Sequence, residues 1–232
     1  MKIASVCAGL AVAVGVSIAV QSGAKDGGRP VVVPAGAIGD GHLVIPVGRE
    51  DAPVTLTVYE DARCPGCAEL ERTLNPTIKR LEDDGKLRIE YHILSFVDRI
   101  VGGEGSKAGA NALAAAQDAG HFREFHDVLF SHPPEEERVD SFKDRRFLLD
   151  LAGQVPGLRS TAFDEAVLED THGPWVNAVQ ERFDEQTRIQ ATPAVIFRGK
   201  DLVRDRRRPL TPQWLAELVE GAAQAKDGTT AG

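Results

Sequence analysis

The sequence predicts an α/β protein in which two small halves of mixed strand and helix flank a helical block. Short runs rich in β-branched residues occur on both sides of the block, whereas within it apolar residues recur every three or four positions. The chain has 232 residues, of which 42% are hydrophobic and 27% charged, as in an average soluble domain. Such a chain is long enough to bury a sizeable core.

The first half is expected over residues 42–102. Strands are predicted at His42–Val47 and Pro53–Tyr59, where β-branched residues dominate. A helix is predicted from Pro65 to Asp84, because its apolar residues are spaced by three or four and a glycine follows. A third strand is predicted at Leu87–Phe96. The first half therefore has the order strand, helix, strand.

The helical block is expected over residues 103–187. Its apolar patterns predict helices at Ala108–Ala119, Phe122–Phe130, Phe142–Ala152, Phe163–Leu168 and His172–Thr187.

The second half is expected over residues 188–225. Strands at Ala194–Arg198 and Leu202–Arg204 would flank a turn at Gly199–Asp201, and a last helix is predicted at Thr211–Ala225.

Residues 1–24 have the pattern of a signal peptide or a membrane anchor. Lys2 precedes an uncharged, mostly apolar run over residues 3–20, and a small-residue stretch at 22–24 could be a cleavage site. The run is also near the lower length limit of a transmembrane helix, so cleavage and anchoring both stay open. Either predicts an extracytoplasmic protein, secreted or membrane-anchored through residues 3–20. Residues 25–41, rich in glycine and proline, are expected to be a flexible linker.

The charge of the chain argues against one class of partner. Lys and Arg total 27 against 35 Asp and Glu, a net charge of −8. Binding to nucleic acid needs a cationic surface, so no nucleic-acid partner is expected.

The chemistry is expected at Cys64-Pro65-Gly66-Cys67, between a predicted strand and a predicted helix. Pro65 suits the first position of a helix, which would put Cys64 at the helix N-terminus. There the helix dipole and free N–H groups favour the thiolate, the form that attacks disulfides. Cys64 is the expected nucleophile and Cys67 the resolving thiol. Arg63 could stabilise the thiolate further, against the charges of nearby acidic residues.

The sequence allows two other interpretations of the cysteine pair. Cys64 and Cys67 could form a zinc site with His121 and His126, although 53 residues separate Cys67 from His121. A purely structural disulfide would close so small a loop that it would stabilise the fold weakly. Redox chemistry is favoured over both, and no metal or cofactor is expected.

The sequence resembles the DsbA-like thiol-disulfide oxidoreductases over about Val47 to Ala225. The matching segments are 51–55 before the second strand, 59–67 around the cysteines, 124–127 in the helical block and 191–194 before a late strand. The resemblance implies a thioredoxin fold with an inserted all-helical domain, together spanning residues 42–228. It is nearest to the extracytoplasmic bacterial members of that family.

The resemblance also implies a substrate site at Thr192 and Pro193. In the family this proline is cis and lies beside the active-site disulfide, and the backbone of the preceding residue pairs with an extended substrate peptide. A trans proline that starts an edge strand is the alternative.

Two departures from the family pattern bear on reactivity. Many relatives carry a buried acid six positions before the first cysteine, where this chain has Val58; Glu60 or Asp61 could substitute if its side chain points inward. Strongly oxidising relatives carry histidine at the position of Gly66. We therefore expect Cys64 to be less acidic, and the disulfide less oxidising, than in the strongest oxidases.

The favoured function is exchange of disulfides in cysteine-containing exported proteins. A membrane redox partner could recycle the cysteine pair, either oxidising or reducing it, and the direction stays open. A reductase and a non-catalytic peptide-binding module are the alternatives. A monomer is expected, because the dimerisation segment of the dimeric isomerases is missing before the core.

Overall fold

The computed structural model describes residues 28–186 and 189–230. In that part of the chain, five strands form one mixed sheet in the order β1-β3-β2-β4-β5. The strands are β1 (Ile45–Val47), β2 (Val54–Glu60), β3 (Leu87–Ile93), β4 (Ala194–Phe197) and β5 (Lys200–Asp201). Strands β2 and β3 are parallel, and the other three pairings are antiparallel.

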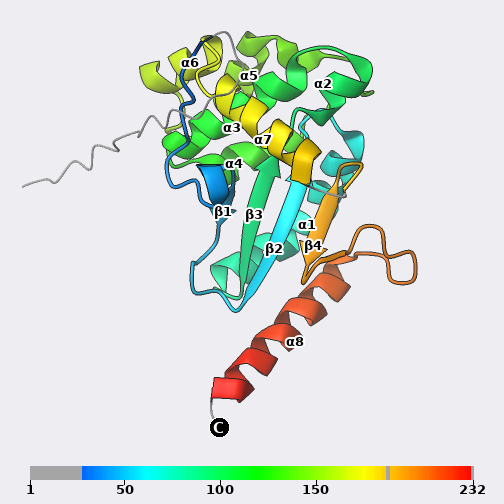
Figure 1. The fold of residues 1–232 in the computed structure, drawn as a ribbon. Coiled ribbons are helices and arrows are strands. Elements are labelled where there is room, and N and C mark those ends of the chain that lie inside the picture. The colour runs from blue at the N-terminus through cyan, green and yellow to red at the C-terminus, as the bar shows by residue number, and fades with distance from the viewer. Residues whose placement is uncertain (1–27, 187–188, 231–232) are drawn as a thin grey trace, which may run out of the picture.

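The helices of the described chain are α1 to α8. They span Pro65–Asp83 (α1), Phe96–Val101 (α2), Gly105–Asp118 (α3), Phe122–Phe130 (α4), Arg145–Ala152 (α5), Thr161–Leu168 (α6), Gly173–Gln186 (α7) and Pro212–Thr230 (α8). Short 3₁₀ helices occur at Asp40–His42 and Ser141–Lys143. Helices α2 to α7 gather at one end of the sheet, while α8 leads away from the other end (Figure 1).

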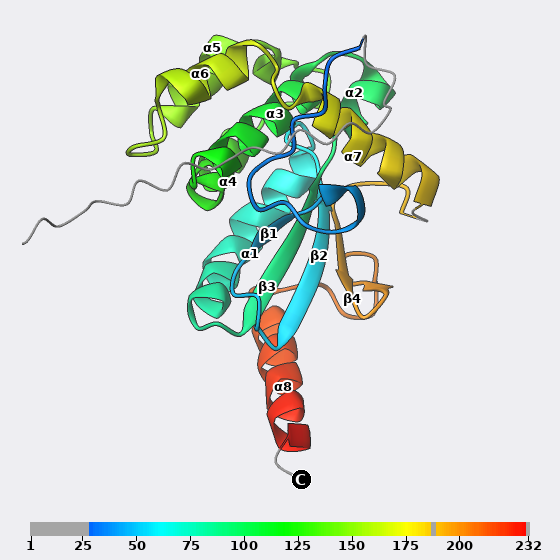
Figure 2. The same ribbon diagram turned by 60° about the vertical axis from the view of Figure 1, so that its left-hand side comes forward.

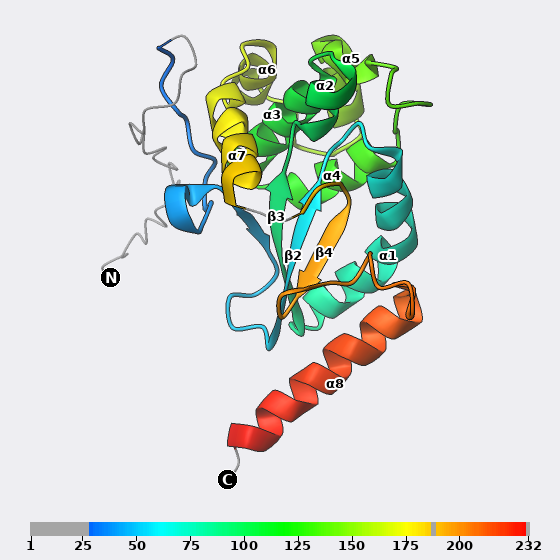
Figure 3. The same cartoon turned by 45° about the vertical axis from the view of Figure 1, so that its right-hand side comes forward.

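The sheet is covered on both faces. Helix α1 packs against β3 and α8, and α7 also contacts β3. Figure 3 shows α1 and α7 on opposite sides of the sheet. In β2 the residues Val54, Leu56 and Val58 are buried and alternate with more exposed ones, as in a strand with one face toward the core. The architecture is the predicted thioredoxin fold with a helical insertion.

The helical block is organised around α3. This alanine-rich helix is buried along most of its length and packs against α4, α5, α6 and α7. Alanine allows neighbouring helices to approach closely on several sides, which explains how one helix can be the centre of the block. The block lies over the end of the sheet at which β2 and β3 terminate (Figure 2).

Several predicted elements differ in the structure. The helix predicted at Phe142–Ala152 is divided into the 3₁₀ helix at Ser141–Lys143 and α5, and the last helix extends to Thr230. The first strand begins at Ile45, because residues 40–42 form a 3₁₀ helix. The third strand ends at Ile93, and the apolar residues after it begin helix α2 instead. The last hairpin pairs Phe197 with Lys200, so its second strand is at 200–201 and not at 202–204. Its turn is Arg198-Gly199, both with positive φ, as a two-residue hairpin turn requires.

The linker expected over residues 25–41 is not what the structure shows from Gly28 onward. Val31 is buried, and Ile38 pairs with Val44 in an isolated β-bridge. The His172 ring contacts the backbone oxygen of Val32 at 2.9 Å. Residues 28–41 therefore pack on the helical block, although they have no apolar period that would predict it.

None of the helices in the described ranges has both the length and the apolar character needed to cross a bilayer. The predicted signal or anchor at residues 3–20 lies outside those ranges.

Candidate active site

The cysteine motif occupies the junction between β2 and α1, as predicted. Cys64 is the N-cap residue of α1, with extended backbone angles of φ −79° and ψ 114°, and Pro65 is the first residue of the helix. The backbone N–H of Cys67 donates to the oxygen of Cys64 at 3.0 Å, which closes the first turn. Both cysteines are free thiols in this structure.

The loop before β4 lies against this turn. The Thr192–Pro193 peptide bond is cis, and the Cys64 thiol is 3.6 Å from the carbonyl oxygen of Thr192. A Cβ atom on Gly66 would be only 3.2 Å from Cδ of Pro193. The structure thus brings the five residues Cys64, Pro65, Gly66, Thr192 and Pro193 to one place, as expected from the sequence.

The two thiols differ in acidity. The pKa of Cys64 is lowered to about 6, mainly because the Cys67 thiol donates a hydrogen bond to it, with further help from the backbone N–H groups of Cys67 and Gly66. Burial raises the pKa of Cys67 well above its ordinary value, and the nearby charge of Glu60 adds to the shift. At neutral pH Cys64 is therefore a thiolate and Cys67 a thiol.

Arg63 does not act on the thiolate in the way that its position in the sequence suggested. Its guanidinium is buried and pairs with Asp98 at 2.5 Å and Asp140 at 3.3 Å. It also donates to the backbone oxygens of Gly102 and Glu137. Arg63 therefore joins the cysteine motif to the helical block.

Both acids before the motif point inward. Asp61 is fully buried and accepts hydrogen bonds from the backbone N–H groups of Arg63 and Val97. Burial raises the pKa of Asp61 to about 7. Glu60 is also fully buried, and its carboxylate is 2.6 Å from Nε2 of His126.

The fold also assembles a buried cluster beside the motif that the sequence does not predict. Glu60, Glu71 and His126 lie together, and neither cysteine nor His121 belongs to the group. The alternative Cys2His2 zinc site is thus not assembled among the described residues. The positions of Glu60 and Glu71 in the sequence do not predict this cluster, because the two residues belong to different elements.

The protonation of this cluster reflects its burial. Burial raises the pKa of Glu71 to about 8, although the charge of His126 opposes the shift. Burial lowers the pKa of His126, but Glu60, Glu71 and Asp127 raise it more, to about 9.

Comparison with known proteins gives consistent matches. The model of the Thioredoxin family matches residues 41–220. Disulfide bond formation protein D of Bacillus subtilis (strain 168) is 27% identical over 157 residues, which cover 66% of this chain and 67% of that protein.

Solved structures are similar over most of the chain. DsbA from Mycobacterium tuberculosis in its reduced form has a TM-score of 0.64 and 21% identity, covering 81% of this chain and 98% of that one. The MdbA protein of Actinomyces oris, a thiol-disulfide oxidoreductase, has a TM-score of 0.63 and 25% identity, covering 77% of this chain and 88% of that one.

Proposed function

We propose that this chain, which belongs to the thioredoxin family, is a thiol-disulfide oxidoreductase that forms disulfides in exported proteins outside the cytoplasm. The observation that carries the proposal is the geometry of Cys64, which combines a helix N-terminus, the buried Cys67 thiol in the same turn and the cis-Pro193 loop 3.6 Å away. The related proteins named for disulfide bond formation support the same activity.

The exchange proceeds through a mixed disulfide. A substrate thiolate attacks Sγ of Cys64 in the oxidised protein, and Cys67 leaves as a thiolate and takes up a proton. A second substrate thiolate then attacks the substrate sulfur of the mixed disulfide, and Cys64 leaves as a thiolate. The substrate gains one disulfide, and the two electrons stay in the cysteine pair of the protein.

The unequal acidity of the two thiols favours oxidation of the substrate by the protein. A leaving thiol with a low pKa departs faster, and a stabilised thiolate stabilises the reduced protein, which makes its disulfide more oxidising. The pKa of about 6 for Cys64 lies above that of the reactive cysteine of DsbA, about 3.5. The disulfide should accordingly be oxidising, but less so than that of the strongest oxidases.

The substrate would bind as an extended peptide along the cis-proline loop. The carbonyl oxygen of Thr192 lies beside the Cys64 thiol, so backbone pairing there would bring a substrate cysteine to Sγ of Cys64. Contacts with backbone leave the choice of substrate sequence open, as a catalyst acting on many exported proteins requires. A membrane redox partner would then reoxidise the cysteine pair.

Whether the protein oxidises or reduces its substrates is tested by equilibrating the full chain with glutathione buffers of known ratio. The free thiols are then trapped by alkylation and counted by mass spectrometry. We expect a reduction potential between about −120 and −230 mV, the range from DsbA to the glutaredoxins. A potential near or below about −270 mV would instead indicate a reductase.

Turnover is tested in oxidative refolding of a reduced, cysteine-containing protein. Cys64→Ser should abolish the rate enhancement. Cys67→Ser cannot form the intramolecular disulfide, but its Cys64 thiolate can attack a disulfide of an oxidised substrate, release one substrate thiolate and accumulate as the mixed disulfide. If Cys64→Ser leaves both refolding and substrate affinity unchanged, the chain is a non-catalytic binding module.

A further inference from the structure

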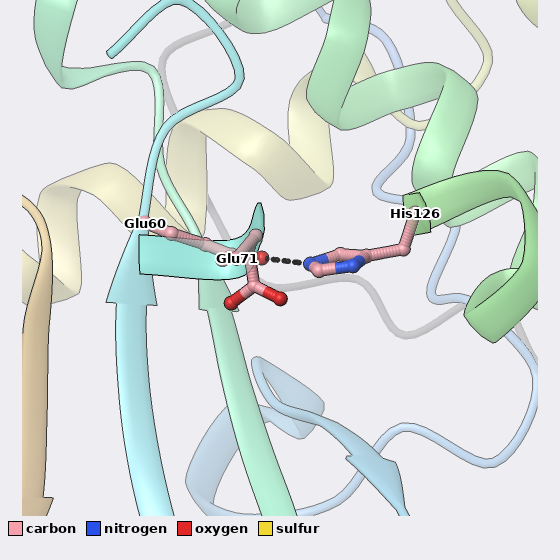
Figure 4. Close-up of side chains that lie close together, drawn as sticks. All are labelled: Glu60, Glu71 and His126. Carbon is pink, nitrogen blue, oxygen red and sulfur yellow. Dashed lines mark hydrogen bonds and ion pairs between the residues drawn. The ribbon is translucent and has the colours of Figure 1, made fainter. Parts of the chain in front are cut away.

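The cluster of Glu60, Glu71 and His126 has the composition of a metal site. Glu60 ends strand β2, Glu71 lies in the second turn of α1, and His126 comes from α4 of the helical block. One ligand atom of each residue lies within 4.8 Å of the other two. Figure 4 shows the carboxylate of Glu71 beside the hydrogen bond that joins Glu60 to His126.

The three side chains are withdrawn from solvent. Their relative exposures are 0% for Glu60, 3% for Glu71 and 3% for His126. Carboxylates are almost never buried this completely unless they are paired or coordinate a metal. Here the carboxyl groups of Glu60 and Glu71 share a single imidazole partner, His126.

Part of the cluster's hydrogen-bonding capacity is unused. Oε2 of Glu60 and Oε2 of Glu71 are buried and have no hydrogen-bond partner among the described residues. A buried polar atom that lacks a hydrogen-bond partner destabilises the folded chain. Two such oxygens beside an imidazole nitrogen are an arrangement that a bound cation would satisfy.

We propose that Glu60, Glu71 and His126 form a binding site for a zinc ion. Imidazole nitrogen and carboxylate oxygen are both zinc ligands, and three protein ligands leave a fourth position for water. Mg²⁺ and Ca²⁺ prefer oxygen ligands alone, and Cu⁺ prefers sulfur, so this mixed set fits zinc better.

Little movement would be needed to bind the ion. Ligand atoms about 2.0–2.2 Å from a tetrahedral zinc ion lie roughly 3.4 Å from one another. His126 Nε2 and Glu60 Oε1 are now 2.6 Å apart, so the ion would replace their hydrogen bond as they separate slightly. The Glu71 carboxylate would move toward the pair.

A surface pocket borders one residue of the cluster, Glu71. It has a volume of about 230 Å³ and is lined by Glu71, Asn75 and Asp127, among others. Asp127 follows His126 on α4 and pairs with Lys79 and Asn75 at the rim.

The site would connect parts of the fold that are distant in sequence. A zinc ion held there would join the end of β2 and the start of α1 to the helical block. Because the ligands are assembled only in the folded chain, zinc should stabilise the fold.

The first test is a zinc titration of the full chain with the Cys64–Cys67 disulfide formed, because free thiols also bind zinc. Competition with a chromophoric chelator should show one Zn²⁺ per chain. Glu71→Gln and His126→Gln should each weaken binding by at least about 10-fold, the smaller of the losses seen even for outer-shell changes. The matched controls Glu69→Gln and His132→Gln alter exposed side chains near the same helices and should bind as the wild type does. Absence of binding to the oxidised wild type, or equal binding by the variants and controls, would overturn the site.

A second measurement uses only the wild type, so it tests the site even if the variants do not fold. X-ray absorption at the zinc edge of the oxidised wild type should show imidazole and oxygen ligands at about 2.0–2.2 Å and no sulfur. A sulfur shell at about 2.3 Å, or oxygen ligands without imidazole, would place the ion elsewhere. Disulfide exchange is measured on the same preparations, so a failure of the zinc site is distinguished from a failure of the redox function.

Discussion

At the scale of single residues, the main asymmetry lies between two cysteines one helical turn apart. Cys64 caps α1 and receives hydrogen bonds, while Cys67 is completely buried and gives one. The pKa of Cys64 is therefore coupled to the side chain at position 67. That coupling can be measured without any substrate.

Replacing Cys67 with alanine should raise the pKa of Cys64. In the wild type, the rate of alkylation of Cys64 should rise with pH around a midpoint of about 6. The alanine variant loses the thiol that donates to Cys64, so its midpoint should move up by roughly one pH unit or more, about 1.4 kcal/mol of lost thiolate stabilisation. Cys67→Ser keeps a donor and should stay closer to the wild type. Equal midpoints in the alanine variant and the wild type would contradict the assignment of this hydrogen bond.

The same shift predicts a pH dependence of stability in the reduced protein. Because folding lowers the pKa of Cys64 from 9.0 to about 6, the stabilisation it brings is complete above about pH 9 and is lost as the pH falls to about 6. The oxidised protein has no thiol at this position and should lack this contribution. Urea denaturation of both forms across this pH range measures the difference. Cys67, whose pKa is raised by folding, contributes in the opposite sense at the alkaline end of the range.

At the scale of elements, Arg63 organises the start of α3. The carboxylate of Asp98 accepts from the N–H groups of Ser106 and Lys107, and that of Asp140 accepts from Glu104 and Gly105. Both carboxylates also pair with the Arg63 guanidinium. Arg63 thus holds the two acids that cap the central helix of the block.

Arg63→Leu should lower the free energy of unfolding by about 3–5 kcal/mol, because it leaves the partners of a buried ion pair without their cation. Arg72→Leu is the matched control, since Arg72 forms an exposed ion pair with Glu69 on α1, and should cost about 0–1 kcal/mol. Both are measured by urea denaturation. Similar losses in the two variants would show that the buried network contributes no more than a surface pair.

The hydrophobic periodicity of the sequence predicts some of these helices and not others. Helix α4 has the predicted bounds of Phe122–Phe130, and α1 ends one residue before the predicted end. Both helices carry an apolar stripe, and Gly85 follows α1. Helix α2 was missed, because its six residues continue the apolar run of β3 and are too few to show a helical period. The Cys64–Cys67 pair is local and could be predicted, whereas the grouping of Glu60, Glu71 and His126 depends on how three elements pack.

At the scale of the whole molecule, the segment before the sheet binds the helical block to the core. Arg29 donates to the backbone oxygens of Glu169 and Asp170, after α6. Farther along, the backbone N–H of Ala35 donates to Asp118 at the end of α3. These contacts join residues more than 80 positions apart, so the segment contributes to the same cooperative unit as the block.

A charge on the buried face of residues 28–41 should therefore destabilise the whole fold, and not this segment alone. Val31 is 5% exposed, and Val31→Asp would bury a carboxylate, which we expect to lower the free energy of unfolding by about 2 kcal/mol or more. Ile100→Asp is the matched control, because Ile100 is 62% exposed on the surface, and should change stability by about 0.5 kcal/mol or less. Urea denaturation followed by tryptophan fluorescence reports on both, since Trp175 is buried and donates to the backbone oxygen of His42. If Val31→Asp unfolds at the same urea concentration as the wild type, residues 28–41 contribute no stability and behave as the linker that their composition suggested.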